Sequence, residues 1–487
     1  MVQPNLDSLR RYENQLQVWV KESKGLVSKK RYFCEIMIDD APYARTSVKD
    51  STTNAVFWGE QFDFPGLAEG MHVIKINLFR VSDSKSSSSK KNSKQKITTV
   101  GTATYSVEKL MENNNLVESW MPIDIPSGTK SKENNSTIRL KFKLTKTMVL
   151  PLEKYKHFAD LLTQRYLQIC TVFEPYILTG QKEEMGKGLV YFLHNVGKVK
   201  DYLTNLAFEK VQQCEDENEE QLLFRNNSIA TKSVESYMKL VGRKYLHEAL
   251  KQPINEICQH PDNTSNDWEV DPTRILNANP SQINSNQNRL EQMTQRFFNS
   301  IVESVNAFPS ELRQLYAGWK QKCHELNVPH LHHRLVCSTL FLRLICPAIL
   351  NPSLFELRND LPSEKASRAL TLIAKCIHNL ANNQKFGNKE HYMEFMNKFI
   401  TANNGKMDMF LNRISSAEDS YSHSSSGFDG YIDPGKELAR LQQILLGIVV
   451  KSPAKSELTK SLYPLVQILE DLDDSIKDIN YRVYVIK

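Results

Sequence analysis

The chain has 487 residues, which is too long for one ordinary hydrophobic core and indicates two or three domains at about 100 to 200 residues each. Hydrophobic residues make up 40% of it and charged residues 24%, a balance that is ordinary for a soluble globular protein and excludes wholesale disorder. A net charge of +6 is small for this length, so we expect no nucleic-acid partner.

The eight cysteines lie far apart, without a CxxC pair or the spacing of a metal site. We therefore expect reduced thiols in a cytoplasmic protein, and no bound metal. Residues 1–15 contain no apolar stretch typical of a signal peptide. The longest apolar run, Ile444 to Val450, is far shorter than the roughly 20 residues that span a membrane, so we expect no spanning helix.

The first part of the chain, from Gln15 to Leu144, consists of short β-rich runs separated by turn residues. Several runs alternate apolar and polar residues, which is the pattern of strands with one buried face. The runs are 16–20, 31–39, 56–64, 72–80, 97–107 and 137–145. This pattern predicts an antiparallel β-sandwich.

After Pro151 the apolar spacing changes to three and four residues, as at Val234, Met238 and Val241, which predicts helices for the rest of the chain. Asn, Ser, Asp, Glu and Pro dominate a few irregular segments of this half. These segments, which we expect at the surface, are 215–220, 260–288 and 415–435.

Arg225 lies on a non-periodic stretch between the acidic segment 215–220 and an amphipathic helix. Its neighbours Asn226, Asn227 and Ser228 favour turns and helix starts because their side chains bond nearby backbone groups. Taken alone, the position predicts no more than a solvated arginine on a loop.

Residues 331–352 form a segment that is apolar on nearly every face and stops, we expect, at Pro347. It should be a buried helix, yet it contains Arg343. A buried guanidinium needs partners, because breaking a buried charged pair costs about 3 to 5 kcal/mol. The partners are either an acidic side chain or the carbonyls of a loop.

A third segment, residues 367–393, predicts an amphipathic helix. Its inward face is formed by Leu370, Ile373, Ala374 and Ile377. The opposite face then carries Lys375, Asn379 and Asn382, spaced by four and three residues. Such a polar ridge is usually a solvated helix face, unless another feature selects it for binding.

These three segments together resemble the Ras GTPase-activating protein family, which includes neurofibromin and the synaptic Ras GAP. Phe224 and Arg225 match the family's finger-loop motif, FLRLICPAI from Phe341 matches its most diagnostic motif, and AKCIHNLAN from Ala374 matches a third block. The resemblance implies an all-α GAP domain over 155–410. We expect a polar low-complexity loop over 411–435 and a helical extension packed on the GAP domain over 436–487.

The resemblance also implies roles for particular residues. Arg225 falls on the arginine finger, Arg343 on the arginine that stabilises the finger loop, and Lys375 on a lysine that contacts the GTPase. The full set expected to bind the GTPase is Phe224, Leu342, Lys375, Asn379 and Lys389. The implied partner is a GTP-loaded Ras-family GTPase, which carries the GTP and Mg²⁺ itself, so no cofactor is expected in this chain.

Three alternatives remain open at this point. The chain could be a scaffold that binds GTP-loaded GTPases without accelerating hydrolysis, as IQ-motif relatives do, but those lack the finger arginine. It could act on Rap instead of Ras, and the sequence does not separate the two substrates. It could also be a lipid- or calcium-responsive adaptor whose helical domain is only structural.

The N-terminal sandwich, residues 10–148, resembles a C2 domain, in particular the one that precedes the catalytic domain of synaptic-type Ras GAPs. Calcium-binding C2 domains cluster several aspartates in two loops, because Ca²⁺ takes six to eight oxygen ligands. Here the first loop, Lys21 to Arg31, has no aspartate, and the second, Val81 to Thr99, has only Asp83. We do not expect calcium binding.

These two loops carry lysines and arginines instead of carboxylates. The residues expected to bind lipid are Lys29, Lys30, Arg31, Lys90, Lys91, Lys94 and Lys96. Each cation near an anionic membrane surface contributes up to about 1 kcal/mol, so the pattern predicts calcium-independent binding to anionic phospholipid and recruitment to the plasma membrane. The alternative is that both loops are simply solvated.

Overall fold

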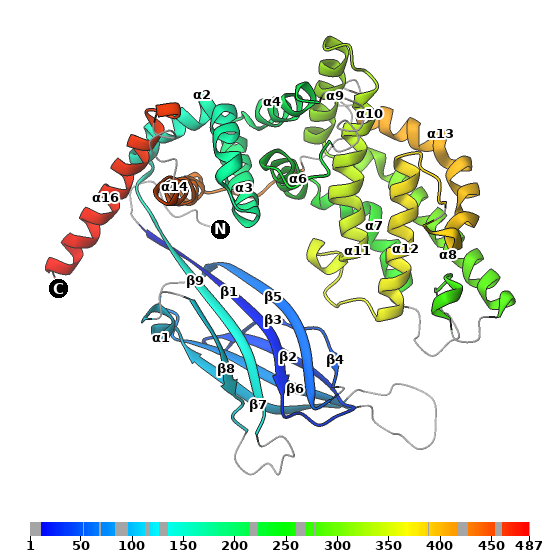
Figure 1. Cartoon of the computed structure of the whole chain (residues 1–487), viewed down its shortest axis with the longest axis horizontal. Helices are drawn as coiled ribbons and strands as arrows, with labels where there is room; N and C mark the ends of the chain where they lie inside the picture. Colours follow the sequence, from blue (N-terminus) through cyan, green and yellow to red (C-terminus); the bar gives the residue numbers. More distant parts are fainter. Residues whose placement is uncertain are drawn as a thin grey trace. The chain divides into compact units, whose positions relative to one another are not determined.

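The computed structural model describes residues 11–486 apart from a few gaps: residue 52, 68–69, 83–95, 113–115, 126–134, 215–222, 260–267, 276–278, 388, 417–426 and 453–459. The chain divides into two compact units, Met1–Glu153 and Lys154–Lys487. The first is built from strands and the second from helices (Figure 1). This confirms the predicted fold class, an antiparallel β domain followed by a larger all-α domain.

The first unit is a sandwich of two antiparallel sheets. One sheet has the order β5-β1-β9-β8, with β5 at Ala55–Leu67, β1 at Arg11–Lys24, β9 at Thr137–Val149 and β8 at Leu116–Pro122. The other has the order β3-β2-β6-β7, with β3 at Ala41–Arg45, β2 at Arg31–Ile38, β6 at Val73–Ser82 and β7 at Lys96–Ser106. A short strand β4, Lys49–Asp50, pairs with β2, and helix α1 spans Val107–Glu112.

Alternation along the strands explains why the sandwich forms. Leu16, Val18 and Val20 of β1 are buried, and the residues between them are less so, which places one face of the strand in the core. All six predicted runs lie in strands. The pattern missed β3, which has no buried residue, and β8, which buries only Met121 and so shows little alternation.

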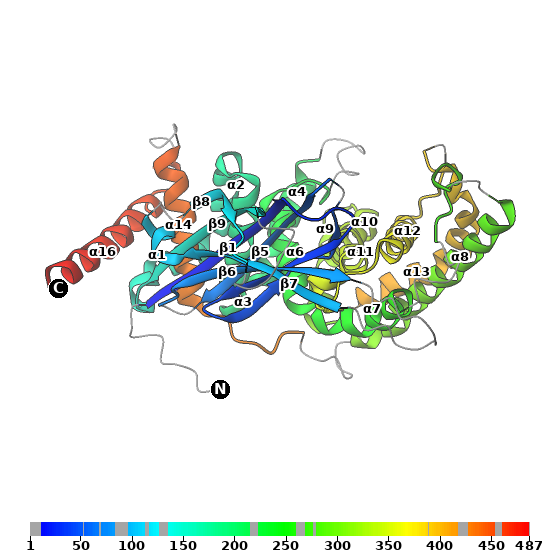
Figure 2. The same cartoon turned by 90° about the horizontal axis from the view of Figure 1, so that it is seen from below.

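The second unit consists of helices. The longer helices are α2 (Lys156–Phe173), α3 (Thr179–Asn195), α4 (Val199–Gln212), α6 (Ile229–Val241), α7 (Arg243–Cys258), α8 (Pro280–Glu303), α9 (Ser310–Glu325), α12 (Glu364–Ala381), α13 (Asn397–Ile414), α14 (Pro434–Lys451) and α16 (Leu465–Ile486). Short helical turns include η2 (Glu174–Tyr176), η6 (Pro352–Phe355) and η7 (His391–Met396). Within this unit α16 lies at one end and α8 and α13 at the other, as Figures 1 and 2 both show.

The polar segment 260–288 differs from the surface loop that we expected. Trp268 and Val270 are buried, and helix α8 already begins at Pro280. Asn279 caps this helix by accepting a hydrogen bond from the backbone N–H of Ser281 at 3.0 Å. The first turns of α8 face solvent and are polar, so they lack the apolar period that reveals a helix.

The apolar segment also differs, because its helix does not stop at Pro347. Helix α10 (Leu331–Val336) continues through a π-helical stretch, Cys337–Ile345, into α11 (Cys346–Leu350). Pro347 lies in the first turn of α11, directly after the π-helical stretch. Residues Leu331–Leu350 have the length and hydropathy of a possible membrane span, but 67% of the most apolar window is buried inside the protein.

The expected C-terminal extension, 436–487, corresponds to α14 and α16, which belong to the same compact unit as the other helices. Helix α14 packs on α3, and α16 contacts α2 and α14. Of the expected loop over 411–435, the start is the end of α13, and 417–426 lie outside the described residues.

Helices α3 and α6 approach closely where α3 carries Gly186. A Cβ at Gly186 would lie 3.0 Å from the backbone nitrogen of Ser233 in α6, whereas a Cβ at Gly447 in α14 would meet nothing within 4 Å. We expect Gly186→Ala to lower the free energy of unfolding by about 1 kcal/mol or more, because overpacking outweighs the gain in helix propensity.

Gly447→Ala is the matched control, and we expect it to raise the free energy of unfolding by about 0.5 to 1 kcal/mol. Chemical denaturation of both variants measures the difference. Equal effects of the two substitutions would show that the close contact between α3 and α6 does not change the free energy of unfolding.

Candidate functional site

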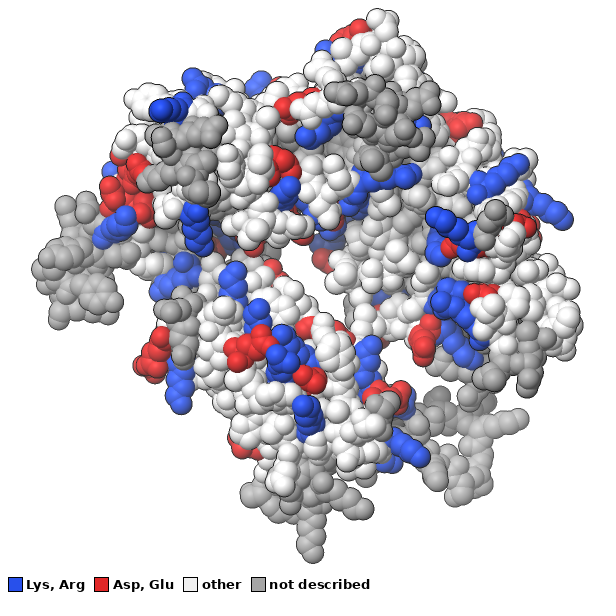
Figure 3. All heavy atoms as spheres, in the orientation of Figure 1, with Lys and Arg blue, Asp and Glu red and all other residues white. Residues whose placement is uncertain are grey.

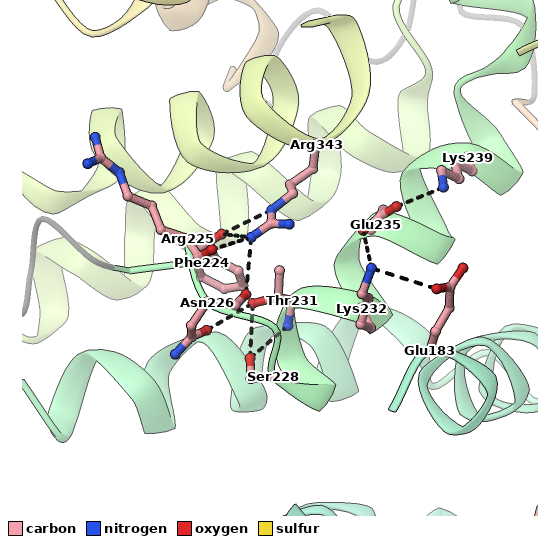
Figure 4. Close-up of polar contacts among 10 residues, drawn as sticks. All are labelled: Glu183, Phe224, Arg225, Asn226, Ser228, Thr231, Lys232, Glu235, Lys239 and Arg343. Carbon is pink, nitrogen blue, oxygen red and sulfur yellow. Dashed lines mark hydrogen bonds and ion pairs between the residues drawn. The ribbon is translucent and has the colours of Figure 1, made fainter. Parts of the chain in front are cut away.

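Arg343 binds the backbone of the loop that carries Arg225 (Figure 4). Its Nε and Nη2 atoms donate hydrogen bonds to the carbonyl of Phe224, at 3.1 and 2.8 Å. Its Nη2 atom also donates to the carbonyls of Arg225, at 2.7 Å, and Asn226, at 3.1 Å. Of the two kinds of partner that a buried guanidinium could have, the fold supplies loop carbonyls.

The charge of Arg343 is half-buried and is balanced by a carboxylate. Burial lowers the pKa of Arg343, and the negative charge of Glu235 in α6 counteracts that shift. Glu235 itself pairs with Lys239 at 2.7 Å and Lys232 at 3.3 Å. Burial would raise the pKa of Glu235, but these two ion pairs outweigh burial and lower it, so the carboxylate stays charged beside the arginine.

Phe224 anchors the same loop through its side chain. The ring is buried and stacks on Trp319 of α9, with the ring centroids 5.9 Å apart. Its backbone has a φ of 58°, in the left-handed region that non-glycine residues adopt only when the surroundings hold them there. The ring of Phe224 therefore supports the loop, and its predicted contact with a GTPase stays a prediction.

The side chain of Arg225 is exposed, as are the following residues Asn226 and Asn227, whereas Phe224 before it is buried. Figure 4 shows the guanidinium pointing away from Arg343, and it makes no hydrogen bond or ion pair with the part of the chain that the structure describes. It does lie near α12. Burial lowers the pKa of His378, and the positive charge of Arg225 lowers it further.

Helix α12 presents the predicted polar ridge beside this loop. Lys375, Asn379 and Asn382 are partly exposed, while the four apolar residues of the predicted stripe are buried. The ammonium group of Lys375 forms an ion pair with Glu390, and the lysine side chain remains 41% exposed. The ridge is therefore accessible to a partner.

The two other residues predicted to bind a GTPase have different surroundings. Leu342, next to Arg343 in the π-helical stretch, is half-buried, and Lys389 is exposed next to Glu390. Sequence reasoning did not find Glu390, Trp319 or Glu235 as supporting residues. Of these three residues, only Glu235 could have been found from the sequence, because it lies three residues after Lys232 and four before Lys239, a spacing that favours ion pairs on one helix.

The predicted lipid-binding residues lie partly outside the described residues. Lys29 and Lys30 are exposed in the loop after β1, and Arg31 is half-buried at the start of β2. Lys90, Lys91 and Lys94 are among the residues that are not described, and Lys96 begins β7. On the face of each unit that Figure 3 shows, basic and acidic side chains are interspersed.

No group of three or more histidines, cysteines and carboxylates with the geometry of a metal site occurs among the described residues. In the first C2 loop, the described positions near Lys29 and Lys30 are polar or basic.

Comparison with known families agrees with this architecture. Residues 14–123 match the C2 domain family, and residues 203–382 match the family described as GTPase-activator protein for Ras-like GTPase. One solved C2 domain covers 27% of this chain and 98% of its own at 13% identity, with a TM-score of 0.19. The C2 assignment therefore rests on the family match and on the sandwich itself. The chain thus contains a C2 domain followed by a domain that matches the GTPase-activator family for Ras-like GTPases.

Two relatives show how far the similarity extends. The chain is 40% identical over 481 residues to the human (Homo sapiens) Ras GTPase-activating protein nGAP, covering 98% of this chain and 40% of that protein. It is 36% identical over 486 residues to the Ras GTPase-activating protein raskol of Drosophila melanogaster, covering 97% of this chain and 30% of that protein. The chain thus spans less than half the length of either relative.

The proximity of Arg225 to α12 gives a testable consequence. We expect Arg225→Ala to raise the pKa of His378, because removing a nearby positive charge makes protonation of the imidazole less costly. An NMR titration of the histidine ring measures the shift.

Arg296→Ala is the control, because it removes an arginine of α8 that does not influence His378. An unchanged pKa of His378 in Arg225→Ala would show that the guanidinium of Arg225 does not lie near α12 in solution.

Proposed function

We propose that this chain stimulates GTP hydrolysis by a Ras-type small GTPase, and that Arg225 enters the active site of that partner. The observation that supports this most directly is the contrast within one loop. Arg343 holds three consecutive carbonyls of the loop, while the guanidinium of Arg225 between them is exposed and unpaired among the described residues. A fixed backbone with a free cationic side chain suits insertion into another protein.

The chemistry follows from how phosphoryl transfer is catalysed. Negative charge grows on the bridging and γ-phosphate oxygens in the transition state, and a positioned guanidinium stabilises it. For the Ras–GAP pair itself, an arginine finger supplied in trans is known to raise the rate by about 10³ to 10⁵. A lysine lacks the planar fork that reaches two oxygens at once. GTP and Mg²⁺ belong to the GTPase, so the chain contributes Arg225 and a binding surface.

The surface that receives the GTPase includes the ridge of α12. Lys375 and Asn379 are partly exposed there, and Lys389 and Leu342 add an exposed and a half-buried side chain. The ion pair of Lys375 with Glu390 is partly exposed, so its rearrangement on binding costs little. We propose that these residues set affinity, whereas Arg225 sets the rate.

We expect Arg225→Ala to reduce the stimulation of GTP hydrolysis by about 10³-fold or more, with nearly unchanged affinity for the GTP-loaded partner. The reason is that the finger acts mainly in the transition state. Phosphate release from a panel of purified Ras and Rap proteins, with and without the chain, measures both the activity and the preferred substrate.

Arg343→Ala is the contrasting variant, because it removes the support of the loop and leaves the finger in place. We expect a smaller loss of stimulation together with lower stability. An Arg225→Ala chain that kept a third of the wild-type stimulation would contradict the assignment of the finger. Binding without any stimulation by wild type would favour a scaffold instead.

We further propose that the C2 unit recruits the chain from the cytoplasm to anionic membranes without calcium. Lys29 and Lys30 are exposed side by side on one loop, and the first C2 loop contains no aspartate. Lys90, Lys91, Lys94 and Lys96 are expected to add to this charge on the second loop. A GTPase activator gains from sharing a surface with a membrane-bound partner, because both are then confined to two dimensions.

We expect Lys29→Gln/Lys30→Gln to weaken binding to vesicles that contain anionic phospholipid, and salt to weaken wild-type binding, because both reduce electrostatic attraction. Sedimentation with vesicles in the presence of a calcium chelator measures this. Lys143→Gln/Lys146→Gln is the control, because it removes the same charge from exposed positions of β9. These positions pair with the first half of β1, away from the loop that carries Lys29 and Lys30, so we expect this variant to bind vesicles almost as the wild type does. Binding that requires calcium, or equal loss in both double variants, would contradict the proposal.

A further inference from the structure

The carboxylate of Glu174 joins three segments behind the finger loop. It lies in η2, directly after α2. Its Oε1 atom is 2.6 Å from the ammonium nitrogen of Lys182 in α3. Its Oε2 atom accepts a hydrogen bond from the backbone N–H of Ile229, at 2.9 Å. Ile229 is the first residue of α6 and follows Arg225 by four positions.

This contact satisfies a backbone group that the helix itself leaves unpaired. The first N–H groups of a helix have no carbonyl partner within it, and a negative charge there is favoured by the helix dipole. Ser228 caps the N–H of Thr231 at 3.1 Å, and Glu174 takes the N–H of Ile229. Two acceptors from different segments thus fix the start of α6, which is the downstream end of the finger loop.

The residues around the Glu174–Lys182 ion pair are partly buried and closely packed. Side chains of Glu174 and Lys182 are only 23% and 19% exposed, so their ion pair is partly shielded from water. Helix α3 also approaches α6 so closely at Gly186 that a Cβ there would meet the backbone of Ser233 at 3.0 Å. Loss of the Glu174 carboxylate would leave the N–H of Ile229 at the start of α6 without this acceptor.

We propose that Glu174 is a positioning residue for Arg225, holding the downstream end of the finger loop while Arg343 holds its carbonyls. This inference rests on the proposed function of Arg225. Glu174 lies before residues 203–382, the part that matches the GTPase-activator family, and outside the three motifs that the sequence displays. Nothing in its own neighbourhood in the sequence points to the finger loop, because 55 residues separate it from Ile229.

A double-substitution experiment separates positioning from a merely structural role. We expect Glu174→Ala to lower the maximal stimulated rate about 10-fold, with the Ras concentration at half-saturation unchanged. In the Arg225→Ala background the same substitution should have no further effect, because a loop without its finger has nothing left to position. The readout is phosphate release from a GTP-loaded Ras protein, together with thermal unfolding of each variant.

Two more variants keep the test decisive. Glu174→Gln retains an oxygen acceptor for Ile229 and loses the charge, so we expect it to recover part of the rate and to fold even if Glu174→Ala does not. Glu256→Ala, which breaks a carboxylate–arginine pair between α7 and α8, is the matched control and should keep the wild-type rate.

A wild-type rate in Glu174→Ala would overturn the inference, and so would an equal loss in the presence and absence of Arg225. Stimulation that is absent even in wild type would instead overturn the proposed function, and this inference with it.

Discussion

The bonds from Arg343 to three consecutive carbonyls are the interaction on which the candidate site depends. The helix that carries Arg343 is buried for packing reasons, and a guanidinium in it would be costly without partners. The loop from Phe224 to Asn226 has carbonyls that no helix or sheet satisfies. The guanidinium therefore gains acceptors for its N–H groups, the loop carbonyls gain a charged donor, and these bonds fix the shape of the loop backbone.

The same loop is held at both ends, and the side chain of Arg225 between them is exposed. Upstream, the ring of Phe224 is buried against Trp319; downstream, the cap of α6 fixes the chain from Ser228 onward. The left-handed backbone at Phe224 is maintained by these contacts. Under the proposed function, a loop backbone that is already held in place loses less conformational entropy when Arg225 enters the partner.

The polar ridge of α12 complements this loop with a different kind of interaction. Lys375 is partly exposed and paired with Glu390, and the positive charge of Arg225, which lowers the pKa of His378, indicates that Arg225 lies beside the same helix. Exposed ion pairs contribute little to stability and rearrange easily. The fold thus combines a rigid loop with an adaptable polar surface, and the first suits catalysis while the second suits recognition.

The sequence by itself determined the local structure and the demands of particular residues. Alternation predicted the strands around Val18, helical spacing predicted the exposed face of Lys375, and an arginine in an apolar helix predicted partners for Arg343. Only the tertiary structure decided which partners these are. Phe224 and Arg343 are 119 residues apart in the sequence, and Glu174 and Ile229 are 55 residues apart. Hydrophobic periodicity describes only neighbouring residues, so it cannot predict contacts over such separations. Helix α8 before residue 288 and strand β3 were missed for a related reason: their residues are mostly exposed, so burial leaves no pattern in them.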